Sequence, residues 1–183
     1  MSVRRIETEI PDLVLLEATA HGDERGFLLE SFREDLWAEH GVAGPFVQEN
    51  HSRSAKGILR GLHFQTSPGQ AKLVRCVRGA IWDVAVDLRR DSPTYKRWEG
   101  VELSDENHRQ LFVPVGFGHG FCVLSDVADV AYKLTSSYDP ETEAGVRWDD
   151  PDIGVDWPID DPQLSERDRV APMLADVENG LPW

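Results

Sequence analysis

The sequence KLVRCVRGAIWDVAVDL, residues 72–88, holds two short runs rich in Val, Leu and Ile on either side of Gly79. The runs Lys72–Arg78 and Ile81–Leu88 have the β-branched and apolar composition of strands. In the second run apolar side chains alternate with polar ones such as Asp83, which predicts a strand with one face in a core. We expect a hairpin turn at Gly79 that pairs the two strands with each other.

Runs of the same kind recur along most of the chain, separated by Gly, Pro, Asp or Ser. Helical composition is confined to Arg33–Gly41, which ends at a glycine suited to a C-cap, and to a short turn after Ser165, which can serve as an N-cap. Many short strands with frequent turns are typical of a sandwich or barrel, so we predict a mainly β fold with a few short helices. Further strands are predicted at Asp12–Ala18, Gly26–Phe32, Ile58–Gln65, Trp98–Leu103, Gln110–Val113, Gly120–Leu124 and Asp129–Leu134.

The length of 183 residues, without repeats or linker-like segments, predicts a single domain over residues 1–183. Within it we expect an N-terminal strand segment over about residues 1–18 and a C-terminal tail over about residues 164–183. The first residues lack the apolar core of a secretory signal. Cys76 and Cys122 have no metal-binding spacing, so we expect buried, unpaired thiols of a reducing cytoplasm.

The charge balance excludes some classes of partner. Lys and Arg number 19 and Asp and Glu 33, which gives a net charge of −14. A nucleic-acid or anionic-membrane surface needs a basic face, so we expect neither partner, and the apolar runs are too short to span a bilayer. A small anionic ligand remains compatible, because cations are concentrated in the middle of the chain, at Arg53, Lys56, Arg60, Lys72, Arg75 and Arg78.

Two motifs suggest a site for a charged ligand beside a proton-transfer group. GILRGLHFQ, residues 57–65, contains Arg60, whose planar fork suits phosphate, and His63, which can exchange a proton near neutral pH. PVGFGHGF, residues 114–121, supplies His119. Regular strand alternation would direct Arg60 and His63 to opposite faces, with His63 and Asp83 inward. Taken singly, a His, Asp or Tyr in a strand is more often a hydrogen-bonded or packed structural residue.

An ordered series of motifs changes this balance. The motifs are Gly22–Phe27, Gln48–Ser52, Gly57–His63, Lys72–Cys76, Asp83–Arg89, Ser92–Thr94, Pro114–Phe121, Tyr132–Lys133 and Trp157–Pro158. In this order they closely resemble the dTDP-4-dehydrorhamnose 3,5-epimerase family over roughly residues 3–173. The resemblance implies a cupin-type β-jelly-roll, a double-sheet barrel that forms a homodimer and binds a dTDP-sugar. It also implies an isomerase of dTDP-L-rhamnose synthesis, a cytoplasmic route to cell-surface polysaccharide.

The resemblance also implies which residues carry the reaction, inversion of carbons 3 and 5 of dTDP-4-dehydro-6-deoxy-D-glucose through an enolate. His63 matches the general base, and Tyr132 matches the acid for carbon 5. Asp168 matches the carboxylate that orients the imidazole, and Asp83 is a weaker candidate for the same role. Lys72 is expected to hold the developing oxyanion.

Ligand-binding residues follow from the same resemblance. Arg25 and Arg60 would pair with the diphosphate, and Tyr138 matches the aromatic residue that stacks on thymine. Simple salt bridges at the rim are the alternative interpretation for three acidic or basic members of the set, Glu30, Glu143 and Arg167. The positions expected to contact the sugar, the diphosphate or the nucleoside are Gln48, Asn50, Glu30, Lys72, His119, Glu143 and Arg167.

The cupin relationship raises the question of a metal. Metal-binding cupins usually supply two His one residue apart and a nearby Glu, but here Gln65 stands two residues after His63 and no Glu follows before Glu99. Only His63 and His119 are available as ligands by motif, and catalytic metal sites usually need three protein ligands. We therefore expect no metal and no cofactor.

Two other functions remain open at this point. One is a related dTDP-sugar enzyme of a deoxysugar pathway, either a 5-epimerase, a 3-epimerase or a 3,4-ketoisomerase. The other is a jelly-roll binding protein without catalysis. The combination of His63, Lys72 and Tyr132 favours the double epimerase.

Overall fold

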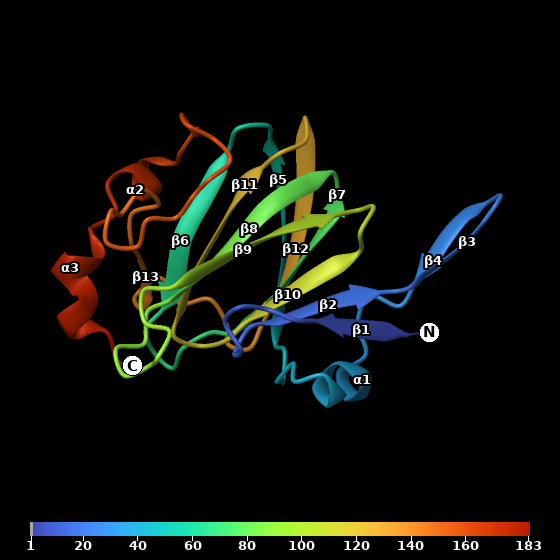
Figure 1. Ribbon diagram of the computed structural model, residues 1–183, viewed down its shortest axis with the longest axis horizontal. Coiled ribbons are helices and arrows are strands. Elements are labelled where there is room, and N and C mark those ends of the chain that lie inside the picture. The colour runs from blue at the N-terminus through green and yellow to red at the C-terminus, as the bar shows by residue number, and fades with distance from the viewer. Residues whose placement is uncertain (1) are drawn as a thin grey trace.

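The computed structural model describes residues 2–183, which form two facing β-sheets and a projecting hairpin (Figure 1). This confirms the mainly β, double-sheet architecture with a few short helices. The six-stranded sheet has the order β1 (Val3–Ile6), β2 (Val14–Ala18), β10 (Arg109–Val113), β7 (Lys72–Arg78), β12 (Val127–Leu134) and β5 (Gln48–Ala55). The five-stranded sheet has the order β13 (Glu143–Gly145), β6 (Leu59–Gln65), β11 (Phe117–Val123), β8 (Ala80–Asp87) and β9 (Trp98–Ser104). The hairpin consists of β3 (Ala20–Asp23) and β4 (Gly26–Leu29).

An apolar core fills the space between the two sheets. Val74, Leu111 and Val130 come from the six-stranded sheet, and Ile81 and Phe121 come from the five-stranded sheet. All five are at most 4% exposed. Side chains of this kind stabilise the fold by about 1.5–3 kcal/mol each when they leave water. The apolar face predicted for β8 is confirmed as buried, but it packs on the outer side of its sheet: Val84 and Val86 lie in a cluster with Leu174, and Trp82 is partly buried beside them.

Separate elements cover the two outer faces (Figure 1). The helix α1 (Glu34–Glu39) packs Trp37 onto the six-stranded sheet, in a cluster with Leu73 and Phe112. The C-terminal segment packs Leu174 onto the five-stranded sheet, in a cluster with Leu62. The apolar side chains on the outer face of each sheet are thus shielded from water by these elements, as the inner ones are by the opposite sheet.

The short helices follow their capping residues. α1 ends before Gly41, whose φ of 96° is one that glycine adopts readily. α2 (Glu166–Arg169) begins at Ser165, whose Oγ accepts a hydrogen bond from the Asp168 backbone N–H at 3.1 Å. Both helices were predicted, whereas α3 (Leu174–Val177) and the 3₁₀ turn η1 (Glu178–Gly180) were not. Within residues 2–183 no helix is both long and apolar enough to cross a membrane.

The turn at Gly79 joins the two sheets, so the predicted hairpin is wrong. β7 pairs with β10 and β12, whereas β8 pairs with β11 and β9. Gly79 has a φ of 76°, and a Cβ there would lie 2.2 Å from the carbonyl oxygen of Val127. A hairpin and a corner between sheets both need a strand, a glycine with positive φ and a second strand. The local pattern therefore cannot tell them apart.

Strand β5 is not predicted by the sequence pattern because its residues are polar on both faces. Its half-buried side chains alternate with exposed ones, but two of them, Asn50 and Ser52, line a cavity and none joins the apolar core. The usual signal of a strand, alternation of apolar and polar residues, is then missing. The pattern also misses the short strands β3 and β13, and the strand predicted at Gly26–Phe32 ends earlier, at Leu29.

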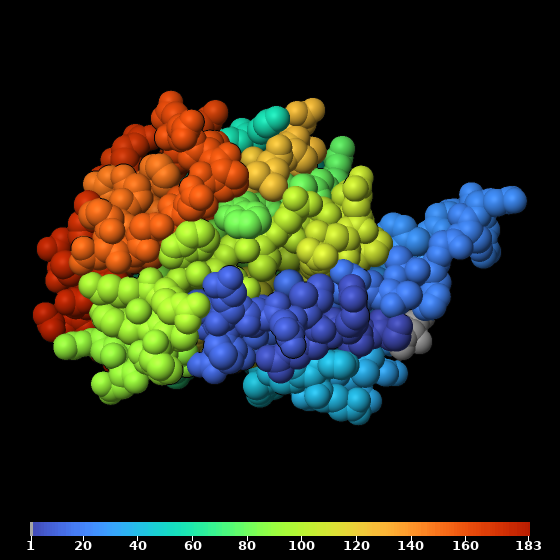
Figure 2. Space-filling view, in the orientation of Figure 1, coloured from blue at the N-terminus to red at the C-terminus, as the bar shows by residue number. Residues whose placement is uncertain are grey.

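The β3–β4 hairpin extends away from the rest of the chain (Figures 1 and 2). Phe27 and Leu28 on β4 are 63% and 62% exposed. Neighbouring large apolar side chains that face water on a projecting element are typical of an interaction surface.

Candidate active site

A cavity of about 200 Å³ opens between the two sheets. Strands β5, β7 and β12 contribute one wall, and strands β6 and β11 contribute the other. Most of the residues predicted to catalyse or bind lie here. The lining residues are Asn50, Ser52, Arg60, His63, Gln70, Lys72, His119, Phe121, Tyr132, Leu134, Tyr138, Glu143 and Arg167.

Arg60 and His63 both line this cavity, so the prediction that they face opposite ways is wrong. The pairing of β6 with β11 shifts between them: His63 is opposite His119, but Arg60 is opposite Phe121. Three steps along β6 thus match two along β11, as in a β-bulge, and the bulge turns both side chains to one face. Gly61 lies in the bulge, where a Cβ would be 2.5 Å from Gly120 Cα.

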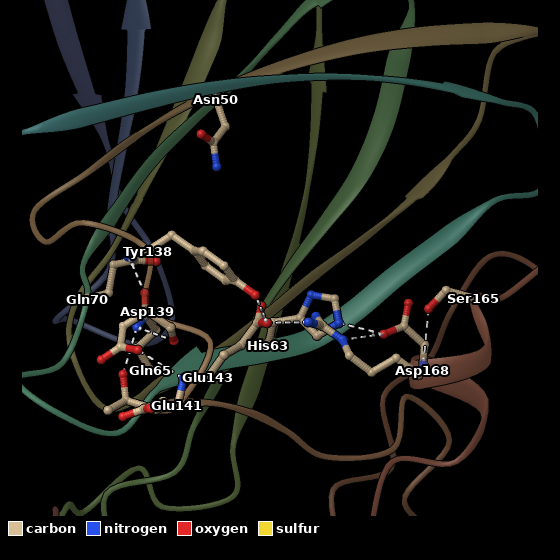
Figure 3. A network of polar contacts seen from close by, with 12 residues as sticks. Asn50, His63, Gln65, Gln70, Tyr138, Asp139, Glu141, Glu143, Ser165 and Asp168 are labelled. Carbon is tan, nitrogen blue, oxygen red and sulfur yellow. Dashed lines mark hydrogen bonds and ion pairs between the residues drawn. The ribbon is translucent and has the colours of Figure 1, made fainter.

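His63 and Asp168 form a hydrogen-bonded dyad (Figure 3). The His63 Nε2 and Asp168 Oδ1 atoms are 2.5 Å apart. Burial lowers the pKa of His63 below its ordinary value, although Asp168 acts in the opposite direction. Burial is the largest influence on Asp168 and acts to raise its pKa, but the hydrogen bond and charge of His63 together with Ser165 and Arg167 outweigh it, so the pKa of Asp168 is lowered. The dyad is therefore a neutral imidazole beside a carboxylate at neutral pH.

Asp83 contacts a different histidine. Its Oδ1 lies 2.9 Å from His119 Nε2, and its side chain is fully buried. His119 is the cross-strand neighbour of His63. Asp83 therefore orients His119, and the carboxylate that touches His63 is Asp168.

Lys72 lies on the floor of the cavity. Its Nζ donates a hydrogen bond to the His63 carbonyl oxygen at 3.1 Å, and the residue is 8% exposed. Burial lowers the pKa of Lys72 from 10.5 to about 8, against the attraction of Glu143 and Asp83. The ammonium is thus cationic at neutral pH, and within residues 2–183 it forms no ion pair with a carboxylate.

Tyr132 stands on the wall opposite the dyad. Its hydroxyl oxygen accepts a hydrogen bond from Asn50 Nδ2 at 3.3 Å, and Asn50 Oδ1 accepts one from Gln48 Nε2 at 2.9 Å. Since the phenolic oxygen is used as an acceptor, its own hydrogen stays free to be donated. A proton acceptor and a proton donor therefore face the cavity from opposite sheets.

Arg60 is held by one nitrogen only. Its Nε donates to Ser54 Oγ at 3.0 Å, and within residues 2–183 its two Nη groups have no protein partner. A guanidinium with a fixed stem and a free fork is suited to bind phosphate oxygens.

Three further predicted residues, Tyr138, Glu143 and Arg167, line the same cavity, and Tyr138 and Glu143 lie side by side (Figure 3). Tyr138 Oη donates to Glu143 Oε2 at 2.9 Å, and Glu143 also accepts from Arg167. Tyr138 is 51% exposed, so a large part of it is open to a ligand.

Arg25 and Glu30 are not brought to the cavity of their own chain. Arg25 lies in the turn of the β3–β4 hairpin and pairs with Asp23. Glu30 follows β4 and lies 3.9 Å from Arg33. The hairpin carries this part of the chain away from the site (Figure 1).

The sequence reasoning missed several lining or supporting residues. Ser52 and Ser54 lie on the same face of β5 as Asn50, and a period of two in polar residues would have been the signal for them. Gln70 lies in a loop without such a signal. For a metal, residues 2–183 contain no group of three or more His, Cys, Asp or Glu side chains arranged to hold an ion.

Comparisons with known proteins support the resemblance. The family model described as dTDP-4-dehydrorhamnose 3,5-epimerase matches residues 7–176. The dTDP-4-dehydrorhamnose 3,5-epimerase of Shigella flexneri is 53% identical over 175 residues, 94% of this chain and 97% of the relative. The dTDP-4-dehydrorhamnose 3-epimerase of Streptomyces niveus is 46% identical over 160 residues, 86% of this chain and 77% of the relative.

A solved structure agrees over almost the whole chain. The dTDP-6-deoxy-D-glucose-3,5-epimerase of Legionella pneumophila, crystallised in complex with dTDP-4-keto-L-rhamnose, is similar with a TM-score of 0.95 and 47% identity. The match covers 98% of this chain and 97% of that chain. On the family model, the sequence identities and this structural agreement, the chain belongs to the dTDP-4-dehydrorhamnose 3,5-epimerase family of isomerases.

Proposed function

We propose that this protein inverts carbons 3 and 5 of dTDP-4-dehydro-6-deoxy-D-glucose and so forms dTDP-4-dehydro-L-rhamnose. The observation that carries the proposal is a base and an acid on opposite walls of one cavity, His63 and Tyr132. Inversion next to a ketone requires that one proton leaves one face of the sugar ring and that another arrives on the opposite face. The ligand of the Legionella structure supports the class of substrate.

His63 is the base through the ring nitrogen that does not contact Asp168. An ionised carboxylate only accepts hydrogen bonds, so Nε2 carries the hydrogen and Nδ1 carries the lone pair. Nδ1 takes the proton from the carbon next to the ketone. The electron pair of the broken C–H bond forms the enolate, whose negative charge rests on the oxygen at carbon 4. The low pKa of His63 keeps the imidazole neutral, as a base must be.

Lys72 stabilises that oxygen, and Tyr132 completes the inversion at carbon 5. A buried ammonium in a site of low dielectric constant interacts strongly with a developing oxyanion, an effect worth roughly 10²–10³-fold for one donor. Tyr132 then transfers its hydroxyl proton to carbon 5 from the opposite face, and the enolate returns to the ketone. The phenolate regains its proton from solvent, and the His63 imidazolium releases to solvent the proton that it took. At carbon 3 the same base removes the proton, and a water molecule supplies the new proton on the opposite face.

The diphosphate and the nucleoside bind to the other polar residues in and around the cavity. Arg60 binds the diphosphate through its free Nη groups, and Tyr138 stacks on thymine with its exposed face. Gln48, Asn50, His119, Glu143 and Arg167 contact the sugar, the diphosphate or the nucleoside.

We infer a homodimer in which the β3–β4 hairpin of each chain covers its partner. The exposed Phe27 and Leu28 supply the apolar contact, and Arg25 and Glu30 then reach the partner's cavity. Mixing two impaired variants, Arg25→Ala and His63→Asn, tests this arrangement. At a 1:1 ratio half of the dimers are mixed and one site of each is intact, so about a quarter of the wild-type activity returns. No recovery in a mixture that exchanges subunits would contradict it.

In the cell, we assign the reaction to the cytoplasm, as a step of dTDP-L-rhamnose synthesis for cell-surface polysaccharide. Loss of dTDP-L-rhamnose from extracts of a deletion strain is the expected result. Unchanged levels would contradict this assignment.

A single-carbon epimerase is the second candidate, favoured by the similarity to the 3-epimerase of Streptomyces niveus. NMR of purified protein with dTDP-4-dehydro-6-deoxy-D-glucose in D₂O separates the possibilities. The double epimerase incorporates deuterium at both carbons and yields the doubly inverted sugar. Exchange and inversion at one carbon would instead support the single-carbon epimerase. A migrated ketone would support the 3,4-ketoisomerase, and no exchange at all would support a binding protein.

A further inference from the structure

Two buried glutamines that take no part in the proposed chemistry lie end to end beneath the segment 136–142 (Figure 3). Gln65 is 3% exposed and ends strand β6, and Gln70 is 9% exposed and follows in the next loop. Gln70 Nε2 donates to Gln65 Oε1 at 2.7 Å. Gln65 stands at the position where metal-binding cupins usually carry a second histidine, so its side chain is free for another role.

Both amides use their hydrogens on the same segment of chain. Gln70 Nε2 also donates to the carbonyl oxygen of Ser136 at 3.0 Å. Gln65 Nε2 donates to Thr142 Oγ1 at 2.8 Å and to the carbonyl oxygen of Asp139 at 3.2 Å. The amide pair therefore ties the segment at its beginning, its middle and its end.

Other hydrogen bonds also reach the two ends of this segment, where Ser136 Oγ donates to the Gly69 carbonyl oxygen at 3.0 Å and the Thr66 backbone N–H donates to that of Thr142 at 2.9 Å, but apolar packing contributes little. Among the side chains that the structure describes, the buried apolar clusters include none from residues 136–142. Tyr138 in its centre is 51% exposed, and its backbone N–H donates to Gln48 Oε1 at 2.8 Å. Glu143 follows directly as the first residue of β13. The position of Tyr138 thus depends on directional hydrogen bonds and not on apolar packing.

We propose that the Gln65–Gln70 amide pair positions Tyr138 and Glu143 to bind the nucleoside, and so sets the affinity for the nucleotide without entering the reaction. This inference rests on the proposed role of Tyr138 in stacking on thymine. Gln65 acts from behind the segment, because it does not line the cavity. It is a positioning residue for the nucleotide end of the substrate.

Gln65→Leu removes the Nε2 group that donates to Asp139 and Thr142. Gln65→Glu removes the same donor group but keeps the shape of the side chain. Either variant should weaken binding of dTDP by roughly tenfold, because buried acceptors lose their partners. KM for the dTDP-sugar should rise by a similar factor, while kcat stays within about twofold. The matched control is Thr66→Val, since the Thr66 backbone N–H still binds the carbonyl oxygen of Thr142.

A double-mutant cycle with Tyr138→Ala separates positioning from general structural support. If Gln65 acts through Tyr138, then Gln65→Leu has no further effect on dTDP affinity in the Tyr138→Ala background. Provided that Tyr138→Ala itself binds dTDP weakly, two results would overturn the inference. One is an additive loss of affinity in the double variant, and the other is wild-type affinity in both Gln65 variants. Wild-type affinity in Tyr138→Ala would instead refute the proposed stacking role, and the positioning role with it.

Discussion

His63 on strand β6 and Asp168 in helix α2 are 105 residues apart in the chain, yet their Nε2 and Oδ1 atoms are 2.5 Å apart. The contact depends on the N-cap of α2, where Ser165 Oγ holds the Asp168 backbone N–H. A buried carboxylate in this position fixes the tautomer of the imidazole and directs its second nitrogen away from Asp168 (Figure 3).

Replacing His63 by Asn should abolish deuterium exchange at both carbons. The base is lost while the side chain keeps a similar size, so kcat should fall by at least about 10²–10⁴-fold and dTDP affinity should stay close to that of the wild type. Exchange is measured by NMR in D₂O, and affinity by titration. Persistent exchange at either carbon would show that another group removes that proton.

Asp168→Asn should shift the acid limb of the pH profile of kcat/KM to lower pH. Asp168 raises the pKa of His63 against the effect of burial, so its removal lowers that pKa further and leaves the base neutral to a lower pH. The plateau should also fall, because the tautomer is no longer fixed. The control is Ser165→Ala, which loses the capping hydrogen bond and about 1 kcal/mol of stability but keeps the Asp168 carboxylate. The acid limb of its pH profile should therefore stay where it is in the wild type. An unmoved limb in both variants would contradict the role of Asp168.

Tyr132→Phe keeps the ring in its packing but removes the proton donor. Carbon 3 should still exchange with D₂O, because His63 and Lys72 remain, whereas inversion at carbon 5 should stop. NMR of the product checks this result, because it reports the configuration and the deuterium content at each carbon. Formation of the doubly inverted sugar at the wild-type rate would make Tyr132 a packing residue.

Arg60→Ala should raise KM far more than it lowers kcat. The guanidinium is the expected partner of the diphosphate, and loss of one member of a buried charge pair costs about 2–5 kcal/mol. Arg60→Lys keeps the charge but loses the fork, so an intermediate effect is expected. Ser54→Ala frees the Nε atom and should have a smaller effect. Equal KM values for the wild type and Arg60→Ala would show that the diphosphate is bound elsewhere.

Lys72→Met should stabilise the protein at neutral pH while it removes activity. The folded chain releases the Lys72 proton at about pH 8, and the unfolded chain at about 10.5. Between these values the unfolded state binds more protons, so the free energy of unfolding of the wild type rises with pH, by roughly 3 kcal/mol in all. The variant lacks this rise and no longer buries a charge. Denaturant unfolding at pH 7 and at pH 10 measures the difference, and an identical rise in both proteins would refute the assignment.

The same group defines the alkaline side of the wild-type activity. If the cationic Lys72 holds the enolate oxygen, kcat/KM falls as pH rises through about 8. On the acid side, activity is lost below the ordinary value of histidine, because the pKa of His63 is lowered. A kcat/KM that stays constant from pH 7 to 10 would show that the charge of Lys72 is not needed for the reaction.

The sequence by itself determined the elements that depend on neighbours in the chain. The alternation in Ile81–Leu88 gave the buried face of β8, and Ser165 gave the start of α2. The motifs around His63 and Tyr132 were sufficient to identify the family. These signals are local, because strand periodicity and capping involve residues only a few positions apart.

The tertiary structure alone decided how those elements meet. It showed that Gly79 turns between sheets, that a bulge brings Arg60 to the side of His63, and that Asp83 supports His119. It also revealed the polar strand β5 and the contact of Gln65 with Gln70. In each case the partner is distant in sequence, and periodicity states which way a side chain faces along its own strand but not which strand lies beside it.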